Sequence, residues 1–177
     1  MNRNPLLLRI ALCGVIAALY TAASLALTPL SFGNIQLRAA EALTLLPVLF
    51  PEAILGVTLG CGLTNAIGAV LGANILGPLD VLFGTAATLI AALLTRRLGG
   101  VRFRGIPWLA ALPPVLVNAL IIGAELSFAL TGSLAPLPFL IFAGEVALGQ
   151  IAACFLLGLP LVVALEKNGL HRRLYGR

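Results

Sequence analysis

Residues 10–27 read IALCGVIAALYTAASLAL, a run of eighteen positions without one charged side chain. Such a run is long enough for a helix to cross the hydrocarbon core of a membrane. A cleaved secretory signal is the alternative, because basic residues precede the run and small residues occur near its end, at Ser24-Leu25-Ala26. The run is longer than the usual signal core of about 7–15 residues, however. We therefore interpret it as the first of several membrane-spanning helices.

The composition of the whole chain supports a membrane protein. Hydrophobic residues make up 60% of the 177 positions, charged residues make up 10%, and the mean hydropathy is +1.10. In a soluble domain about a quarter of the residues are charged, because its surface faces water. We therefore expect an all-α membrane protein whose residues 1–177 form a single transmembrane domain, a six-helix bundle. Pro, Gly, Asn and charged residues separate six apolar segments, at residues 8–30, 37–50, 53–71, 79–98, 106–130 and 137–165.

The positive charges predict the orientation of these helices. They fall in three short clusters: Arg3 and Arg9; Arg96, Arg97, Arg102 and Arg104; and Lys167, Arg172, Arg173 and Arg177. With six helices all three clusters lie on one side and only Arg38 is left for the other, whereas five helices would put one cluster outside. Cytoplasmic loops carry the excess of Lys and Arg. We therefore expect both termini in the cytoplasm, a multi-pass protein of the cytoplasmic membrane, and no role for the net charge of +5 in binding nucleic acid.

Ionisable side chains within the apolar segments are the most informative feature of the sequence. Each costs roughly 2.5–3.5 kcal/mol at the centre of a membrane helix, so each needs a reason to be there. At a rise of about 1.5 Å per residue, Glu41, Glu125 and Glu145 lie roughly 6–12 Å below the outer ends of three different helices. Asn65 and Asn118 lie nearer the middle of the membrane. This layer predicts a polar pocket in the outer half of the bundle, with an apolar floor.

The spacing of these residues indicates the chemistry of a ligand. Asn118 and Glu125 are seven apart and share one face of their helix, and Phe128 extends that stripe by three positions. Phe142 and Glu145 are likewise three apart on the last helix. A planar ligand with N–H groups at its edge suits carboxylates flanked by aromatic rings. An interhelical hydrogen bond between the two glutamates is the structural alternative.

Arg38 is the one cation that the sequence places near the acidic layer. It stands three positions before Glu41, so the two could simply form an ion pair at the membrane interface. The layer as a whole remains acidic, and it therefore favours a cationic or donor-rich ligand.

Small residues recur every four positions at Gly14, Ala18, Ala22 and Ala26. Such a stripe permits close helix approach, and we interpret it as a flat face for another membrane protein. A similar pattern at Gly56 and Gly60 is interpreted as internal packing.

The sequence offers no constellation for catalysis. It lacks the HExxH and GxSxG motifs of metalloproteases and hydrolases. It also lacks the GxxxxGK[ST] phosphate-binding loop, so any ATP-driven step would need another protein. We expect no enzyme activity, no metal and no cofactor.

Three stretches carry a resemblance to a known family: residues 37–47 (LRAAEALTLLP), 56–61 (GVTLGC) and 80–89 (DVLFGTAATL). Over most of residues 30–100 the chain resembles the queuosine-precursor transporter (QueT) family, the substrate-binding S components of energy-coupling-factor (ECF) transporters. The resemblance implies a six-helix subunit that captures a 7-deazaguanine base and works with a transmembrane coupling subunit and two ATPases. It also implies that the AxxxA pattern of the first helix faces the coupling subunit.

Combined with the acidic layer, this resemblance predicts a site. Glu125 or Glu145 would read the guanine edge, with Phe128 or Phe142 stacking on the ring, and Glu41 would meet an aminomethyl group or be held by Arg38. Two other functions stay open: an S component for another vitamin or base, and a stand-alone proton- or cation-coupled carrier.

Overall fold

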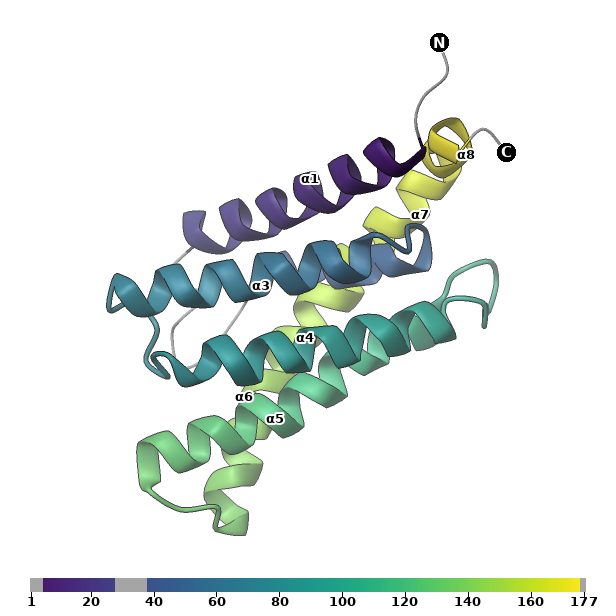
Figure 1. The fold of residues 1–177 in the computed structure, drawn as a ribbon. Helices are drawn as coiled ribbons and strands as arrows, with labels where there is room; N and C mark the ends of the chain where they lie inside the picture. Colours follow the sequence, from purple (N-terminus) through teal and green to yellow (C-terminus); the bar gives the residue numbers. More distant parts are fainter. Residues whose placement is uncertain (1–4, 28–37, 176–177) are drawn as a thin grey trace.

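The computed structural model describes residues 5–27 and 38–175 of the chain (Figure 1). Within this part every regular element is a helix, apart from an isolated bridge between Phe103 and Ile106. The elements are α1 (Pro5–Ala26), η1 (Ala39–Val48), α3 (Ala53–Val70), α4 (Leu79–Leu98), η2 (Trp108–Ala111), α5 (Leu112–Thr131), α6 (Pro136–Ile151), η3 (Ala152–Gly158), α7 (Leu159–Lys167) and α8 (Leu170–Tyr175). The prediction of an all-α fold is confirmed.

Five helices of the described chain are long and apolar enough to cross a membrane. They cover Pro5–Ala26, Ala53–Val70, Leu79–Leu98, Trp108–Thr131 and Pro136–Lys167. The second of the six predicted segments, residues 37–50, contains only the ten-residue 3₁₀ helix η1 in its described part. At about 2.0 Å per residue this helix covers roughly 20 Å, short of a hydrocarbon core of about 30 Å. Pro47 inside η1 and Pro51 just after it limit the helix, because proline cannot donate the next backbone hydrogen bond.

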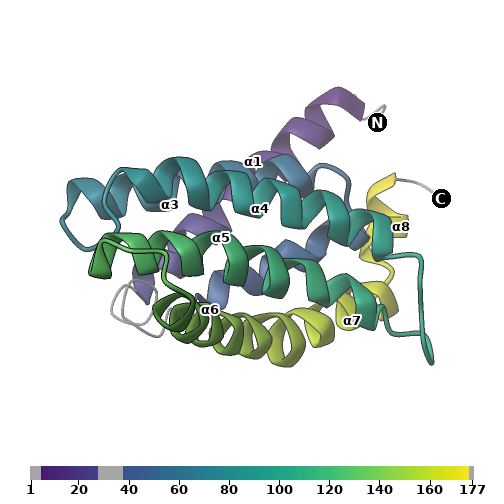
Figure 2. The same cartoon turned by 90° about the horizontal axis from the view of Figure 1, so that it is seen from below.

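The long helices pack in chain order around η1. Neighbouring contacts join α1 to α3, α3 to α4, α4 to α5, and α5 to α6. Figures 1 and 2 show α1, α3 and α4 side by side, and they show the start of α1 at the same end of the bundle as α8. η1 contacts α1, α3, α4 and the π-helical segment η3, and seven of its residues are buried. The helix η1, which is too short to span a membrane, is thus enclosed mainly by helices that are long enough to do so.

Glycines of α3 set the distance between α1 and α3. A Cβ at Gly56 would lie 2.9 Å from Cβ of Ile16, and a Cβ at Gly60 would lie 2.7 Å from Cβ of Tyr20. Only a hydrogen fits at these positions, so the helices approach closely. The interpretation of this pair as internal packing is confirmed.

The last span changes its helical pitch in the middle. α6 continues through the π-helical η3 into α7 without a loop, and Pro160 follows directly after the first residue of α7. Proline removes a donor and clashes with the preceding turn, and a widened turn just before it accommodates both effects. This irregular segment lies against η1, so the two non-α helices of the interior meet.

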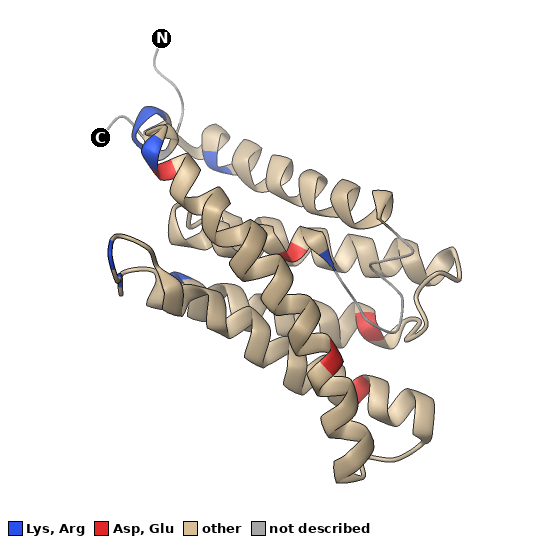
Figure 3. Ribbon diagram, turned by 180° about the vertical axis from the view of Figure 1, so that it is seen from behind, with Lys and Arg blue, Asp and Glu red and all other residues tan. Residues whose placement is uncertain are grey.

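Charges are distributed unevenly along the bundle. Figure 3 shows Lys and Arg gathered mainly at the end where α8 lies, while acidic positions also occur in the interior and towards the opposite end. At the basic end Arg96 donates to the carbonyls of Pro47 and Val48, at 3.0 and 2.9 Å, and Arg9 pairs with Glu52 at 3.2 Å.

Candidate binding site

A buried ion pair joins the start of η1 to the start of α4. Nη2 of Arg38 donates to Oδ2 of Asp80 at 2.7 Å, and both side chains are buried. The same Oδ2 accepts a hydrogen bond from Nδ2 of Asn74 at 2.9 Å, and the Asp80 carbonyl accepts one from Nδ2 of Asn65 at 2.8 Å. Gly84 leaves room for this cluster, since a Cβ there would lie 2.5 Å from both Asn65 and Asp80.

Glu41, one turn into η1, has a different partner. The hydroxyl of Tyr20 on α1 donates to Oε1 of Glu41 at 2.5 Å, and neither side chain is accessible to solvent beyond 1%. The other carboxylate oxygen, Oε2, is buried without a hydrogen bond of normal geometry, and the Gln150 side chain is the donor near this carboxylate. The Tyr20 hydroxyl therefore fixes the carboxylate through one of its two oxygens.

The backbone of Glu41 is held by η1 and η3 together. Its carbonyl accepts from the Thr44 hydroxyl at 2.5 Å and lies 3.7 Å from Sγ of Cys154. Cys154 also lies 3.8 Å from Oε1 of Gln150 at the end of α6. The π-helical turn thus brings the last span up to the glutamate.

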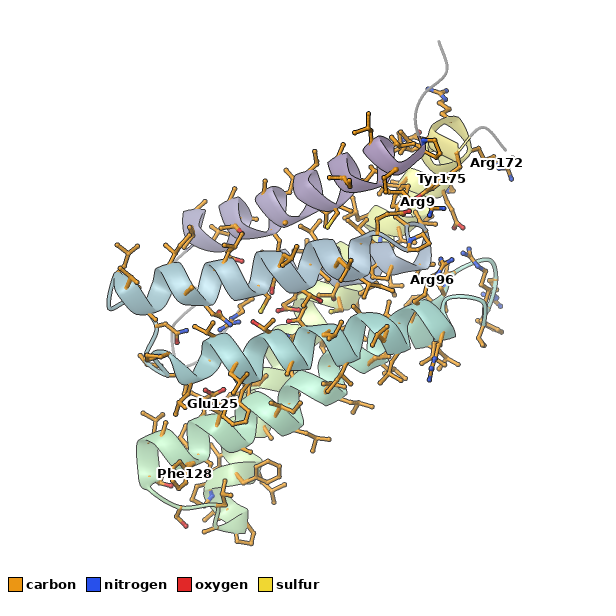
Figure 4. All side chains as sticks on the ribbon, viewed as in Figure 1. Arg9, Arg96, Glu125, Phe128, Arg172 and Tyr175 are labelled. Carbon is orange, nitrogen blue, oxygen red and sulfur yellow. The ribbon has the colours of Figure 1, made fainter. Side chains whose placement is uncertain are left out.

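A second group of polar side chains is carried by α5 and α6. Asn118 and Glu125 occupy the buried face of α5, as their seven-residue spacing predicts, and Glu145 projects from α6. Both oxygens of Glu125, Oε2 of Glu145 and Nδ2 of Asn118 are buried without a hydrogen-bond partner. Figure 4 shows Glu125 on the side of α5 that faces α4.

The two predicted aromatic residues lie in different surroundings. Phe142 is partly buried and packs against the apolar cluster formed by residues of α4, α5 and α6. Phe128 is 58% exposed and lies near the end of α5, outside the buried polar group (Figure 4). Three positions after Glu125 the helix has turned about 60° from the same face, and α5 ends at Thr131, just before Gly132, which adopts φ +66°. Phe128 is therefore largely exposed at the end of α5, whereas Phe142 packs inside the bundle.

Several buried polar atoms of the two groups have no hydrogen-bond partner. A buried polar atom without a hydrogen bond costs about 1–3 kcal/mol, and a buried charge without a partner costs more. The side chains of this group are Arg38, Glu41, Asn65, Asp80, Asn118, Glu125 and Glu145, which carry four acids and one base. Arg38 forms an ion pair with Asp80 at 2.7 Å, so the described residues of this group carry three more carboxylates than cations.

Sequence reasoning missed three members of the site. Tyr20 was read as part of an apolar run, although a buried tyrosine hydroxyl usually needs a partner. Asp80 is the second residue of the segment 79–98, and Asn74 lies between two predicted segments. Tyr20 and Asp80 have partners far along the chain, 21 and 42 residues away, whereas the partner of Asn74 is Asp80, six residues away.

The predicted partner surface is open in the structure. Ile16, Ala17, Tyr20 and Ser24 form the buried side of α1. The stripe of Gly14, Ala18, Ala22 and Ala26 lies on the exposed side, and no atom lies within 4 Å of a Cβ built at Gly14. Within residues 5–27 and 38–175, therefore, no side chain covers the stripe.

No group of three or more His, Cys, Asp or Glu side chains within the described ranges could hold a metal ion. Apolar helices of spanning length around buried ionisable groups are typical of membrane proteins that bind polar molecules or ions. Comparison with protein families identifies the particular family. The family model described as QueT transporter matches residues 10–167, so the chain belongs to the QueT transporter family. This is a family of membrane transporters and not of enzymes. Comparisons with curated proteins and with solved structures gave no match.

Proposed function

We propose that this chain is the substrate-specific subunit of an energy-coupling-factor transporter and captures a queuosine precursor, a 7-deazaguanine base, from outside the cell. The family membership supports a transporter for such a precursor. The observation that carries the ligand chemistry is the set of buried carboxylate oxygens without donors on Glu41, Glu125 and Glu145.

A 7-deazaguanine offers the donors that these oxygens lack. Its ring N–H and exocyclic amine lie on one edge, where a carboxylate can accept both as a bidentate pair. Glu125 or Glu145 would read this edge, and Phe142, which is partly buried beside them, would stack on the ring. The ammonium of an aminomethyl derivative would meet Glu41, whose second oxygen has no hydrogen bond of normal geometry. Phe128, the other aromatic residue that the sequence suggests for stacking, is 58% exposed near the end of α5, so we favour the partly buried Phe142 for this role.

The transmembrane arrangement that fits this role has six passes, with η1 as a short buried pass. The start of α1 and α8 at the same end agrees with an even number of passes (Figure 1). The basic clusters then lie in the cytoplasm, as the excess of Lys and Arg in cytoplasmic loops requires. The polar group lies towards the outer side of a single transmembrane domain in the cytoplasmic membrane.

Energy would come from partners. The chain has no phosphate-binding loop, so ATP hydrolysis would be carried out by two ATPase subunits that act through a transmembrane coupling subunit. The exposed stripe of Gly14, Ala18, Ala22 and Ala26 would contact that coupling subunit, because small residues allow close helix approach.

Equilibrium binding to the purified protein in detergent tests the substrate. Aminomethyl and cyano 7-deazaguanine are the ligands, and guanine and thiamine are the controls. Saturable binding of a deazaguanine, selective over both controls and without any partner protein, is the expected result. Failure of both deazaguanines to bind to folded protein would remove the queuosine assignment, and binding of thiamine would favour an S component for another vitamin.

Uptake into vesicles separates the proposal from a stand-alone carrier. Vesicles that contain this chain alone should accumulate no substrate under a proton or sodium gradient. Accumulation by the chain alone would instead establish a cation-coupled carrier that uses the acidic group as its relay.

A further inference from the structure

A cavity at the basic end of the bundle is unrelated to the acidic group. It has a volume of about 270 Å³ and lies between the loop before η2 and the end of α7. Its lining consists of Arg104, Gly105, Ile106, Val163, Glu166 and Lys167. This volume is below the range of about 300–1,000 Å³ typical of drug-sized ligands, so a small headgroup is the appropriate size of occupant.

The charge of the cavity is positive, because its one acid is already neutralised. Arg102 binds both carboxylate oxygens of Glu166, at 2.7 Å each, in the two-pronged geometry that is strongest for such pairs. This bond also raises the pKa of Arg102, so the guanidinium stays charged. The charges of Arg104 and Lys167 are not balanced by any other acidic side chain of the lining. The cavity therefore presents two cations for an anion.

The turn that carries Arg104 is shaped at a conformational cost. Phe103 and Ile106 exchange backbone hydrogen bonds of 3.0 and 3.1 Å across a two-residue turn, in which Arg104 has φ +52° and Gly105 has φ +80°. Such a turn favours Asn-Gly, and a long side chain at the first position is disfavoured. Strained backbone conformations of this kind cluster at functional sites, so the conformation of Arg104 supports a binding role for its side chain.

The surroundings of the turn are those of a membrane interface. Phe103 is 66% exposed, and the guanidinium of Arg104 lies 5.5 Å from the centre of its ring. Trp108, 43% exposed, follows a few residues later. Aromatic side chains beside basic ones are typical of the level where lipid headgroups begin.

We propose that this cavity binds the phosphate of an anionic phospholipid, with Arg104 and Lys167 as its ligands and Phe103 beside the acyl chains. The proposal is independent of the substrate of the transporter. Each cation at a membrane surface contributes about a fivefold preference for anionic lipid, so we expect roughly a 25-fold preference from the pair. The preference should fall as salt is raised, because exposed charges are screened.

Trp108 makes the site measurable, because it is the only tryptophan in the chain. Its backbone N–H donates to the carbonyl of Ile106, which lines the cavity, at 3.0 Å. We would reconstitute the full chain in vesicles and compare quenching of its fluorescence by brominated phosphatidylglycerol and by brominated phosphatidylcholine. The expected result is quenching at a much lower mole fraction of the anionic lipid.

Three variants test the assignment. The double variant R104Q/K167Q should lose the preference, whereas R97Q/R172Q, which removes two exposed charges outside the lining, should keep it. Arg104→Asn should lower the preference about fivefold while the unfolding temperature stays equal or rises, because asparagine suits the turn better. A role of Arg104 in stability alone would lower the unfolding temperature instead.

Equal quenching by the two lipids would overturn the proposal. So would an undiminished preference in R104Q/K167Q, because the anionic lipid would then be held elsewhere. Displacement of the brominated anionic lipid by millimolar inorganic phosphate would also overturn it, since it would identify a site for a free phosphate anion.

Discussion

Replacing Gly84 by alanine tests the buried polar cluster with the smallest possible change. The added Cβ would lie 2.5 Å from Nδ2 of Asn65 and 2.5 Å from Oδ1 of Asp80, far inside ordinary contact. Both groups would have to move, and their movement would strain the hydrogen bond from Asn65 to the Asp80 carbonyl and the ion pair with Arg38. One methyl group at this position therefore disturbs the centre of the site.

The magnitude follows from three effects. Overpacking a tight interior costs about 1–3 kcal/mol. A lost hydrogen bond costs about 0.5–1.5 kcal/mol, and the better helix propensity of alanine returns up to about 1 kcal/mol. We expect a net loss of roughly 1–3 kcal/mol, which lowers the unfolding temperature of a chain of this size by about 2–12 °C.

Two matched variants distinguish an effect on the binding site from a general effect on packing. The readouts are thermal unfolding in detergent and ligand binding. Gly56→Ala meets only Ile16 and the Cys13 backbone, so it should lower stability while the folded fraction keeps its ligand affinity. Gly144→Ala has no atom within 4 Å and should be neutral or slightly stabilising. Gly84→Ala should lose both stability and affinity. If it were as stable as the wild type and bound ligand equally well, the cluster described here would not be the one present in the membrane.

Three further predictions concern other parts of the fold. Tyr20→Phe should cost about 1.5–3 kcal/mol in the same unfolding assay, because the Glu41 carboxylate loses its donor in the interior; an unchanged unfolding temperature would contradict that hydrogen bond. Burial and the hydrogen bond to Glu52 raise the pKa of Tyr175 to about 12. The contribution of the neutral Tyr175 hydroxyl to the free energy of unfolding should therefore be complete below pH 10 and be lost between pH 10 and 12. The variant Tyr175→Phe should lack this part of the pH dependence, and an identical profile would disprove the contribution. Ala18→Leu should leave the unfolding temperature of the isolated chain unchanged, since the side chain is exposed, and should weaken assembly with the coupling subunit at least tenfold; full assembly, measured by co-purification, would place the contact elsewhere.

Hydropathy was sufficient to predict most of the fold. The predicted segments 53–71 and 79–98 agree with α3 and α4 to within a residue, because long apolar runs bounded by Pro and Gly leave little freedom. The segment 37–50 was predicted as a span like the others, but it forms the short 3₁₀ helix η1. Its composition is as apolar as that of a spanning helix, and only its packing inside the bundle allows it to be shorter.

The site was predictable in its chemistry and not in its pairing. The rule that buried ionisable groups are functional found Glu41, Glu125 and Glu145. It could not choose the partner of Arg38, because helix periodicity connects residues three or four apart and therefore suggested Glu41. In the structure Arg38 pairs with Asp80, on another helix. Contacts between helices depend on how the bundle packs, which local spacing does not encode.

The position of Phe128 shows a second limit. Its spacing from Glu125 predicts a shared stripe, yet its side chain is 58% exposed. Three residues place two side chains near each other on a helix without giving them the same surroundings. At the end of α5 the neighbouring helices no longer cover that stripe, so a residue there can face outward while Glu125 one turn earlier is buried.

The most direct test of the account is the affinity of aminomethyl and cyano 7-deazaguanine for the wild type and for the Glu125→Gln and Glu145→Gln variants. The wild type should prefer the aminomethyl form, because the described residues of the site carry four carboxylates and one cation. At the position whose carboxylate binds the guanine edge, glutamine should lower the affinity for both ligands by about 10- to 150-fold. This factor corresponds to one hydrogen bond to a charged group. Wild-type affinity for both ligands in both variants would contradict the claim that the unpartnered carboxylates bind the substrate.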